Sequence, residues 1–218
     1  MIPTIFIIIS LLSLLLFYFG TGRNKRLLLI FTTWQFAVGG LAAFRVFQEK
    51  SNLFPFAILG TVILTFLMLK RINRQKINAK MLLAVHALRI PVELVLYQLY
   101  LQNKIPGLMT FKGWNFDILI GFSALVLLVY ALITNRKFNK QFFIFWNTAG
   151  ILFLLFIVSL AILSSPLPIQ LFAFDQPNTA VLEFPYCLLP TCVVPIVLMS
   201  HILLLAHKLY ILQPAKEK

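Results

Sequence analysis

The stretch MLLAVHALRIPVELVLYQLYLQ, from Met81 to Gln102, carries most of the information about the fold and the site of this chain. It is apolar enough to cross a membrane, yet Arg89 and Glu93 lie within it. Apart from Asp117, the second residue of the predicted span 116–134, these two are the only charged residues inside any segment that we predict to span a membrane. A charge at that depth is costly and usually marks a functional site. The stretch therefore indicates where a site should be sought.

The composition of the chain indicates a membrane protein. Of 218 residues, 61% are apolar and 11% are charged, and the mean hydropathy is +0.93; soluble domains have about 25% charged residues. Because a helix crosses a bilayer with ~20 apolar residues, we expect an all-α bundle of seven spans in a single domain, residues 1–218. The alternative is six spans with one re-entrant or interfacial segment. The predicted spans are 2–20, 27–44, 53–69, 81–102, 116–134, 142–163 and 185–207.

The positions of Lys and Arg predict the orientation of the bundle. Basic residues of short loops remain on the cytoplasmic side, and seven spans with the N-terminus outside and the C-terminus cytoplasmic place most of them there. The net charge of +13 is then explained by topology, so we expect no nucleic-acid partner. The cytoplasmic basic residues would be Arg23, Lys25, Arg26, Lys70, Arg71, Arg74, Lys76, Lys80, Arg136, Lys137, Lys140, Lys208, Lys216 and Lys218.

The longest connection, residues 164–184, is predicted to cap the outer face. It contains several prolines and no basic residue, and its apolar and polar side chains are interleaved. Two interpretations are open. The segment is either an interfacial loop anchored by aromatic residues or a lid over an outward-facing cavity.

Polar side chains form a stripe along the stretch 81–102. At ~100° per residue the stripe lies within a wedge of about 80°, and it must face the bundle interior or a wet cavity because lipid cannot satisfy it. We expect Arg89 and Glu93, one turn apart, to pair with each other, and Pro91 to kink the helix between them. Either the pair fixes helix packing or it forms a ligand or proton site. The stripe consists of His86, Arg89, Glu93, Tyr97 and Tyr100.

Other polar residues are predicted to lie at the depth of this stripe. Counting from the cytoplasmic ends at ~1.5 Å per residue places several side chains of three other helices in one layer with His86. The alternative is that each makes only an interhelical hydrogen bond. The residues of this layer are Trp34, Gln35, His86, Trp146, Asn147 and His201. The full set of candidate site residues is Arg89, Glu93, His86, His201, Asn147, Gln35 and Tyr97.

Several chemistries are argued against by what the sequence lacks. The last span has no lysine for a retinal Schiff base, no GxSG turn occurs, and the three histidines are scattered, which predicts no metal site. No Walker or dinucleotide glycine pattern is present. Aspartyl catalysis needs two buried aspartates, and we expect Asp117 and Asp175 both to lie outside the membrane. We therefore predict no cofactor and assign no catalytic residue.

Four blocks of sequence resemble an uncharacterised family of small bacterial membrane proteins with seven helices. They are ALRIPVELVLY (87–97), NFDILIG (115–121), FDQPNTAVLEFPY (174–186) and LPTCVVPIVLMSH (189–201). The resemblance implies a multi-pass protein of the bacterial plasma membrane and carries over neither an activity nor functional residues.

The expected function is small-molecule binding or transport, with the lipid bilayer as surroundings. Arg89 would receive an anionic group and Glu93 would be its partner or a proton carrier. Two alternatives are open. One is an integral-membrane enzyme acting on a lipid-like substrate, with Glu93 as acid or base and His86 or His201 assisting. The other is a structural or assembly subunit. The sequence leaves the oligomeric state open.

Overall fold

The computed structural model describes residues 1–134 and 138–206, and within them every regular element is a helix. Some residues for which the sequence predicts a location lie outside this part of the chain. They are Arg136, Lys137, His207, Lys208, Lys216 and Lys218. The longer helices are α1 (Ile2–Gly20), α2 (Lys25–Ala43), α4 (Phe54–Arg71), α5 (Ala79–Ala87), α6 (Arg89–Leu101), α7 (Asp117–Thr134), α8 (Lys140–Leu163) and α9 (Val194–Ala206). The shorter ones are α3 (Val46–Glu49), η1 (Ser51–Leu53), η2 (Arg74–Lys76), η3 (Gly107–Met109), η4 (Ala180–Leu182) and η5 (Leu189–Val193).

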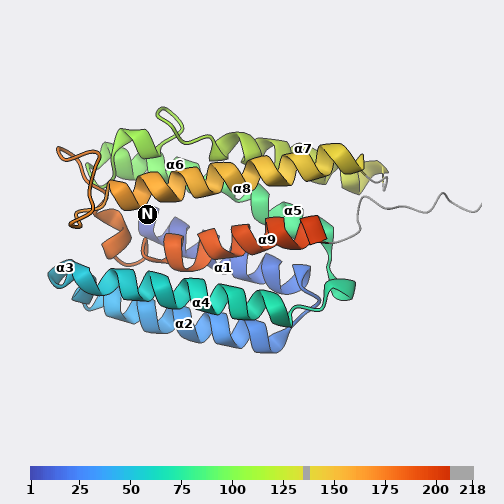
Figure 1. Ribbon diagram of the computed structural model, residues 1–218, viewed down its shortest axis with the longest axis horizontal. Coiled ribbons are helices and arrows are strands. Elements are labelled where there is room, and N and C mark those ends of the chain that lie inside the picture. Colours follow the sequence, from blue (N-terminus) through green and yellow to red (C-terminus); the bar gives the residue numbers. More distant parts are fainter. Residues whose placement is uncertain (135–137, 207–218) are drawn as a thin grey trace, which may run out of the picture.

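The helices form an elongated bundle in which α9 lies between two outer layers. In Figure 1, α6, α7 and α8 are at the top, α1, α5 and α9 in the middle, and α2 and α4 at the bottom. Helix α9 packs against α8, α5, α4 and α1. The apolar segment that η5 and α9 form together, Leu189–Ala206, has 61% of its residues buried, against at most 39% for each of the other long apolar helices. The core of the bundle is therefore built around α9.

Six helices in the described part of the chain are long and apolar enough to cross a membrane. They are Ile2–Gly20, Lys25–Ala43, Ser51–Arg71, Asp117–Thr134, Lys140–Leu163 and Leu189–Ala206. The predicted fourth span, 81–102, is not a single helix. It is divided into α5 and α6, and neither half is long enough to cross alone.

Pro91 explains why this helix divides at Leu88. Proline has no N–H, and its ring clashes with the carbonyl of the residue four positions earlier, which is Ala87, the last residue of α5. Leu88 closes the end of α5 through its N–H to Val85 O (3.2 Å), and α6 then resumes with Val92 N–H to Leu88 O (3.1 Å). Pro91 thus lies in the first turn of α6, where proline is tolerated. The predicted interruption is present, one turn earlier than the proline itself.

The segment 164–184 is folded against the rest of the bundle. The N–H groups of Thr179 and Ala180 donate to Lys104 O at 3.0 and 3.1 Å, and the side-chain amide of Gln176 donates to Ile105 O at 2.6 Å. Lys104 also forms an ion pair with Glu183. The segment is therefore an ordered cap that is tied to the connection after α6.

Candidate functional site

Arg89, the first residue of α6, lies at the centre of a buried polar network. Its Nη1 donates to Asp117 Oδ1 at 3.1 Å, and its Nη2 lies 3.1 Å from His201 Nε2 and 3.5 Å from Gly150 O. Arg89 is 4% exposed and Asp117 is 6% exposed. One guanidinium thereby joins α6 to α7, α8 and α9.

The ion pair corrects two expectations from the sequence. Arg89 was expected to pair with Glu93 on its own helix, but its ion pair is with Asp117 of α7. Asp117 was expected in an outer loop and is buried instead. The reason is visible in Figure 1, where α7 begins part-way along the bundle while α8 continues to the capped end. Asp175, by contrast, is exposed, so the chain still lacks the two buried aspartates of an aspartyl protease.

Hydrogen bonding assigns a neutral tautomer to His201. Arg89 can only donate, so His201 Nε2 must accept. On the other side of the ring, Nδ1 lies 2.9 Å from Asn147 Oδ1, and the amide nitrogen of Asn147 donates to Phe143 O at 2.8 Å. Asn147 Oδ1 is therefore the acceptor and His201 Nδ1 the donor. Both histidine nitrogens are used, and the ring is fixed in one orientation.

His86, at the end of α5, stacks on His201. The two ring centroids are 3.8 Å apart at an interplanar angle of 28°, and Trp146 meets His86 edge-on at 5.5 Å. Neither ring nitrogen of His86 has a hydrogen-bond partner among the described residues. The predicted layer is thus present for His86, Trp146, Asn147 and His201.

Two glycines make this close packing possible. A Cβ on Gly150 would lie 2.3 Å from His201 Cε1, and a Cβ on Gly121 would lie 2.9 Å from Ile90 Cγ1 and 3.2 Å from Arg89 Cβ. No side chain fits at either position without moving a neighbour. Gly150 of α8 therefore admits the His201 ring, and Gly121 of α7 admits the start of α6.

Glu93 lies one turn beyond Arg89 and is only partly satisfied. Its Oε1 accepts from Asn115 Nδ2 at 2.6 Å, while its Oε2 has no hydrogen-bond partner in the described part of the chain. The residue is 2% exposed. Asn115 also caps α7, because its Oδ1 accepts from Asp117 N–H at 3.0 Å. The sequence did not identify Asn115 and Asp117 as site residues, although both lie in the NFDILIG block.

Both charged residues of α6 line a cavity of about 380 Å³. Its polar wall consists of Arg89, Glu93, Asn115 and Asp117, and its other walls are apolar faces of α4, α8 and α9 together with part of the cap. A buried carboxylate at the wall of a large apolar cavity is an arrangement typical of a ligand site. The site can accept a hydrogen bond at Glu93 and place an apolar body beside it.

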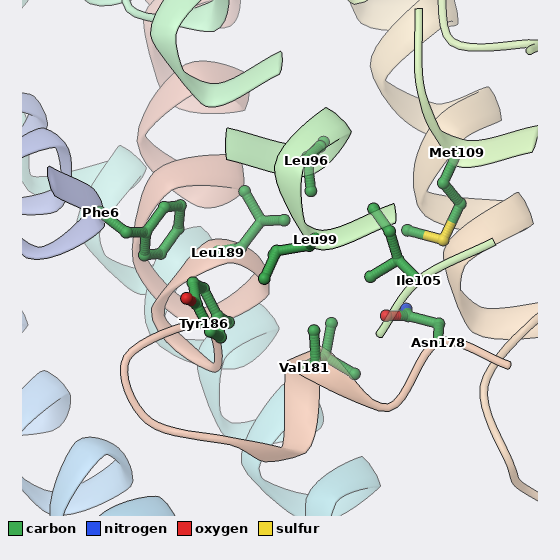
Figure 2. A pocket seen from close by; sticks show the side chains of 10 residues that line it. Phe6, Leu96, Leu99, Ile105, Met109, Asn178, Val181, Tyr186 and Leu189 are labelled. Atoms are coloured by element: carbon green, nitrogen blue, oxygen red, sulfur yellow. The ribbon is translucent and has the colours of Figure 1, made fainter. Parts of the chain in front are cut away.

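A much smaller void of about 10 Å³ lies next to this cavity at its capped end. Figure 2 shows the side chains around it, and five of them also line the large cavity. Among these, Asn178 Oδ1 is buried and has no partner within the described ranges. The five shared residues are Leu96, Met109, Asn178, Val181 and Leu189.

Five of the predicted site residues do not line the large cavity: His86, His201, Asn147, Gln35 and Tyr97. The first three form the layer behind Arg89. Gln35 instead exchanges hydrogen bonds with Thr191, donating to its carbonyl at 2.8 Å and accepting from its hydroxyl at 3.0 Å.

Tyr97 and Trp34 also lie apart from the cavity wall. Lys112 Nζ donates to Tyr97 Oη at 2.6 Å, and this hydrogen bond raises the pKa of the exposed Lys112. Trp34 donates to Thr61 Oγ1 at 2.8 Å. Gln35 and Trp34 therefore bind neighbouring helices rather than the His86 layer.

Metal ligation receives no support from the side-chain geometry. The residues whose positions are described contain no group of three or more His, Cys, Asp or Glu able to hold an ion.

Fold and site together define an apolar helical bundle with a buried charged site. Residues 46–209 match the family described as "Domain of unknown function (DUF8737)", and the chain belongs to this family. The match includes the Arg89 network, every residue that lines the cavity and all four blocks of the resemblance. Neither a curated protein nor a solved structure matches the chain.

Replacing Gly150 by Ala should destabilise the protein. The new methyl group must displace the His201 ring, which costs about 1–3 kcal/mol for overpacking and loses its hydrogen bonds as well. We expect a net loss of about 2 kcal/mol in the free energy of unfolding, measured by detergent-induced unfolding in mixed micelles. Gly40→Ala is the matched control, since nothing lies within 4 Å of that Cβ, and it should be neutral or stabilising by up to about 1 kcal/mol.

Replacing Asp117 by Asn should also destabilise the protein, because it leaves the buried Arg89 guanidinium without its ion-pair partner. Removing one partner of a buried pair costs about 3–5 kcal/mol. The control is Glu183→Gln in the partly exposed pair with Lys104, which should cost less than about 1 kcal/mol. Equal losses in the two variants would show that Asp117 has no special role in holding Arg89.

Proposed function

We propose that the chain is a multi-pass protein of the bacterial plasma membrane with seven crossings, an outer N-terminus and a cytoplasmic C-terminus. Six crossings would be the long apolar helices, and the additional one, fourth in chain order, would be α5 and α6 in succession. Together these two helices cover residues 79–101. At 1.5 Å per residue they are about 34 Å long, which is enough to cross the hydrocarbon core. The distribution of basic residues between alternate loops supports this orientation.

We further propose that the protein binds, and in a transport cycle would move, a small molecule in the cavity beside Glu93. One observation carries this proposal. Glu93 lines a cavity of about 380 Å³ although it is 2% exposed, and its Oε2 lacks a partner among the described residues. A purely structural carboxylate would be expected to have both oxygens satisfied.

Arg89 and Glu93 differ in their availability to a ligand, although the sequence suggested that Arg89 would receive an anionic group. Arg89 is neutralised by Asp117 and is further bound to His201, so a free anion would have to compete with Asp117 for it. Glu93 is the group left available to a ligand or to a proton. Arg89 then acts mainly by holding the wall of the site in place.

An enzyme acting on a lipid-like substrate is the second candidate, because the cavity walls are apolar. Glu93 would then be the acid or base. His86 and His201 are poorly placed to assist it, since neither lines the cavity. For this reason binding or transport is the function that we favour.

The crossing formed by α5 and α6 can be tested with single cysteines on either side of it. Lys76→Cys and Gln102→Cys both replace exposed residues, while the native Cys187 and Cys192 are buried and provide an unreactive background. In intact cells a membrane-impermeant maleimide should label Gln102→Cys and not Lys76→Cys. Labelling of both or of neither before lysis, with both reactive afterwards, would favour the six-span count.

Occupancy of the cavity can be tested by blocking it. Val158 of α8 lines the cavity, whereas its neighbour Ser159 is exposed and does not. In lipid nanodiscs, the apolar photoprobe adamantyl diazirine should label buried cavity residues at the end of η5 and in α9, such as Val193 and Val197. Val158→Trp should reduce this labelling at least about fivefold, since an indole fills much of such a cavity.

Ser159→Trp is the matched control and should leave the α9 labelling unchanged. Labelling of Val126 on α7, which is 67% exposed, reports the probe in the surrounding lipid and should not differ between variants. If Val193 and Val197 stay unlabelled in the wild-type protein while Val126 is labelled, the cavity does not admit small molecules and the proposal fails.

A further inference from the structure

The chemistry of the cavity wall narrows the class of ligand, on the premise that the cavity is a binding site as proposed above. Two unpaired polar atoms belong to residues of this wall. Glu93 Oε2 can accept a hydrogen bond and Arg89 Nε can only donate one, and both atoms are buried without partners in the described ranges. Such unpaired groups are costly in a protein interior unless something binds to them.

A hydroxyl group is complementary to both atoms. It donates one hydrogen bond and accepts others, so it can give its proton to Glu93 and accept from Arg89. An ammonium group only donates and a carboxylate only accepts, so each leaves one of the two atoms unsatisfied. Glu93 and Arg89 are four residues apart on α6 and therefore lie on one face of the helix.

The remainder of the cavity suits an apolar chain. On α4, α8 and α9 the only lining residues with polar side-chain atoms are Thr61 and Thr65. Both hydroxyls donate within their own helix, to Ala57 O at 2.8 Å and to Thr61 O at 2.7 Å. From Phe54 to Phe66 the lining of α4 extends about 18 Å at 1.5 Å per residue. Between α4, α8 and α9 the space is therefore long and offers no unpaired polar atom; the other unpaired atom of the lining, Asn178 Oδ1, lies at the capped end.

The cavity opens sideways, between α4 and α8. Several of its lining residues are also exposed on the outer surface, including Phe66 (59%), Leu155 (49%) and Val62 (44%). At the capped end, by contrast, the segment 164–184 is held by its hydrogen bonds to Lys104 and Ile105. In a membrane the open side faces lipid, so a ligand reaches Glu93 from the bilayer.

From these observations we infer that the ligand is a membrane-resident amphiphile with one long apolar chain and a terminal hydroxyl group. The hydroxyl binds Glu93 and Arg89, and the chain lies between α4 and α8 against α9. The narrow polar wall accommodates one small group of this kind, and the apolar surroundings exclude a large zwitterionic head group.

Competition among head groups on a common chain tests this inference. The probe is a long-chain primary alcohol with a diazirine in its chain, photolysed with the wild-type protein in phosphatidylcholine nanodiscs, and labelling of α9 is read by peptide mass spectrometry. Competitors of equal chain length are the alcohol, its methyl ether, the amine and the carboxylate. Only the alcohol can donate a hydrogen bond to the charged Glu93, so it should compete with the probe at least about tenfold more strongly than the methyl ether does.

Glu93→Gln provides the decisive comparison. With Asn115 still donating to the amide oxygen, the amide nitrogen replaces Oε2, and an acceptor becomes a donor. The alcohol should then lose its advantage over the methyl ether, to within about threefold. Glu49→Gln makes the same change at an exposed glutamate outside the cavity and should keep the wild-type order.

The outcomes separate this inference from the proposed function. If α9 is not labelled by any probe, the cavity is not a binding site and both fail. If α9 is labelled but all competitors act equally, or the amine or carboxylate is preferred, the binding site stands and the hydroxyl assignment is overturned. Persistence of the alcohol preference in Glu93→Gln would likewise overturn it.

Discussion

The need to neutralise one buried guanidinium organises this bundle. Arg89 lies in an apolar interior where an isolated cation would be very costly. It meets the carboxylate of α7, a carbonyl of α8 and the imidazole of α9. Since lipid offers no driving force for helices to associate through apolar surface, such polar contacts and close packing at Gly121 and Gly150 are what fix the register of these four helices.

Pro195 leaves one backbone carbonyl of its helix without the usual donor, and a side chain of a neighbouring helix replaces that donor. Pro195 cannot donate to the carbonyl four residues earlier, which belongs to Thr191. The side-chain amide of Gln35 donates to that carbonyl instead, at 2.8 Å. A freed carbonyl inside a membrane must find some donor. This accounts for a buried glutamine on α2 without a ligand, and it removes Gln35 from the candidate site on physical grounds.

The sequence allowed the apolar helices, the interrupted stretch 81–102 and the grouping of His86, Trp146, Asn147 and His201 to be predicted, because each depends on local composition or helical periodicity. The same count wrongly placed Trp34 and Gln35 in that group. The partner of Arg89 could not be obtained in this way. Periodicity places Glu93 on the same helix face, but it says nothing about which other helix supplies a counter-charge. The assignment of Asp117 to an outer loop was wrong because the segment before α7 enters the bundle and carries Asn115 and Asp117 with it.

Arg89 and Glu93 therefore have different roles although they lie one turn apart. Arg89 makes contacts with three other helices, so any substitution there disturbs packing and ligand binding together. Glu93 has one hydrogen bond, to Asn115, and one free oxygen, so its loss removes little that holds the fold. Function can be separated from stability at Glu93 and not at Arg89. Substitutions at Glu93 therefore report ligand binding with the least disturbance of the fold.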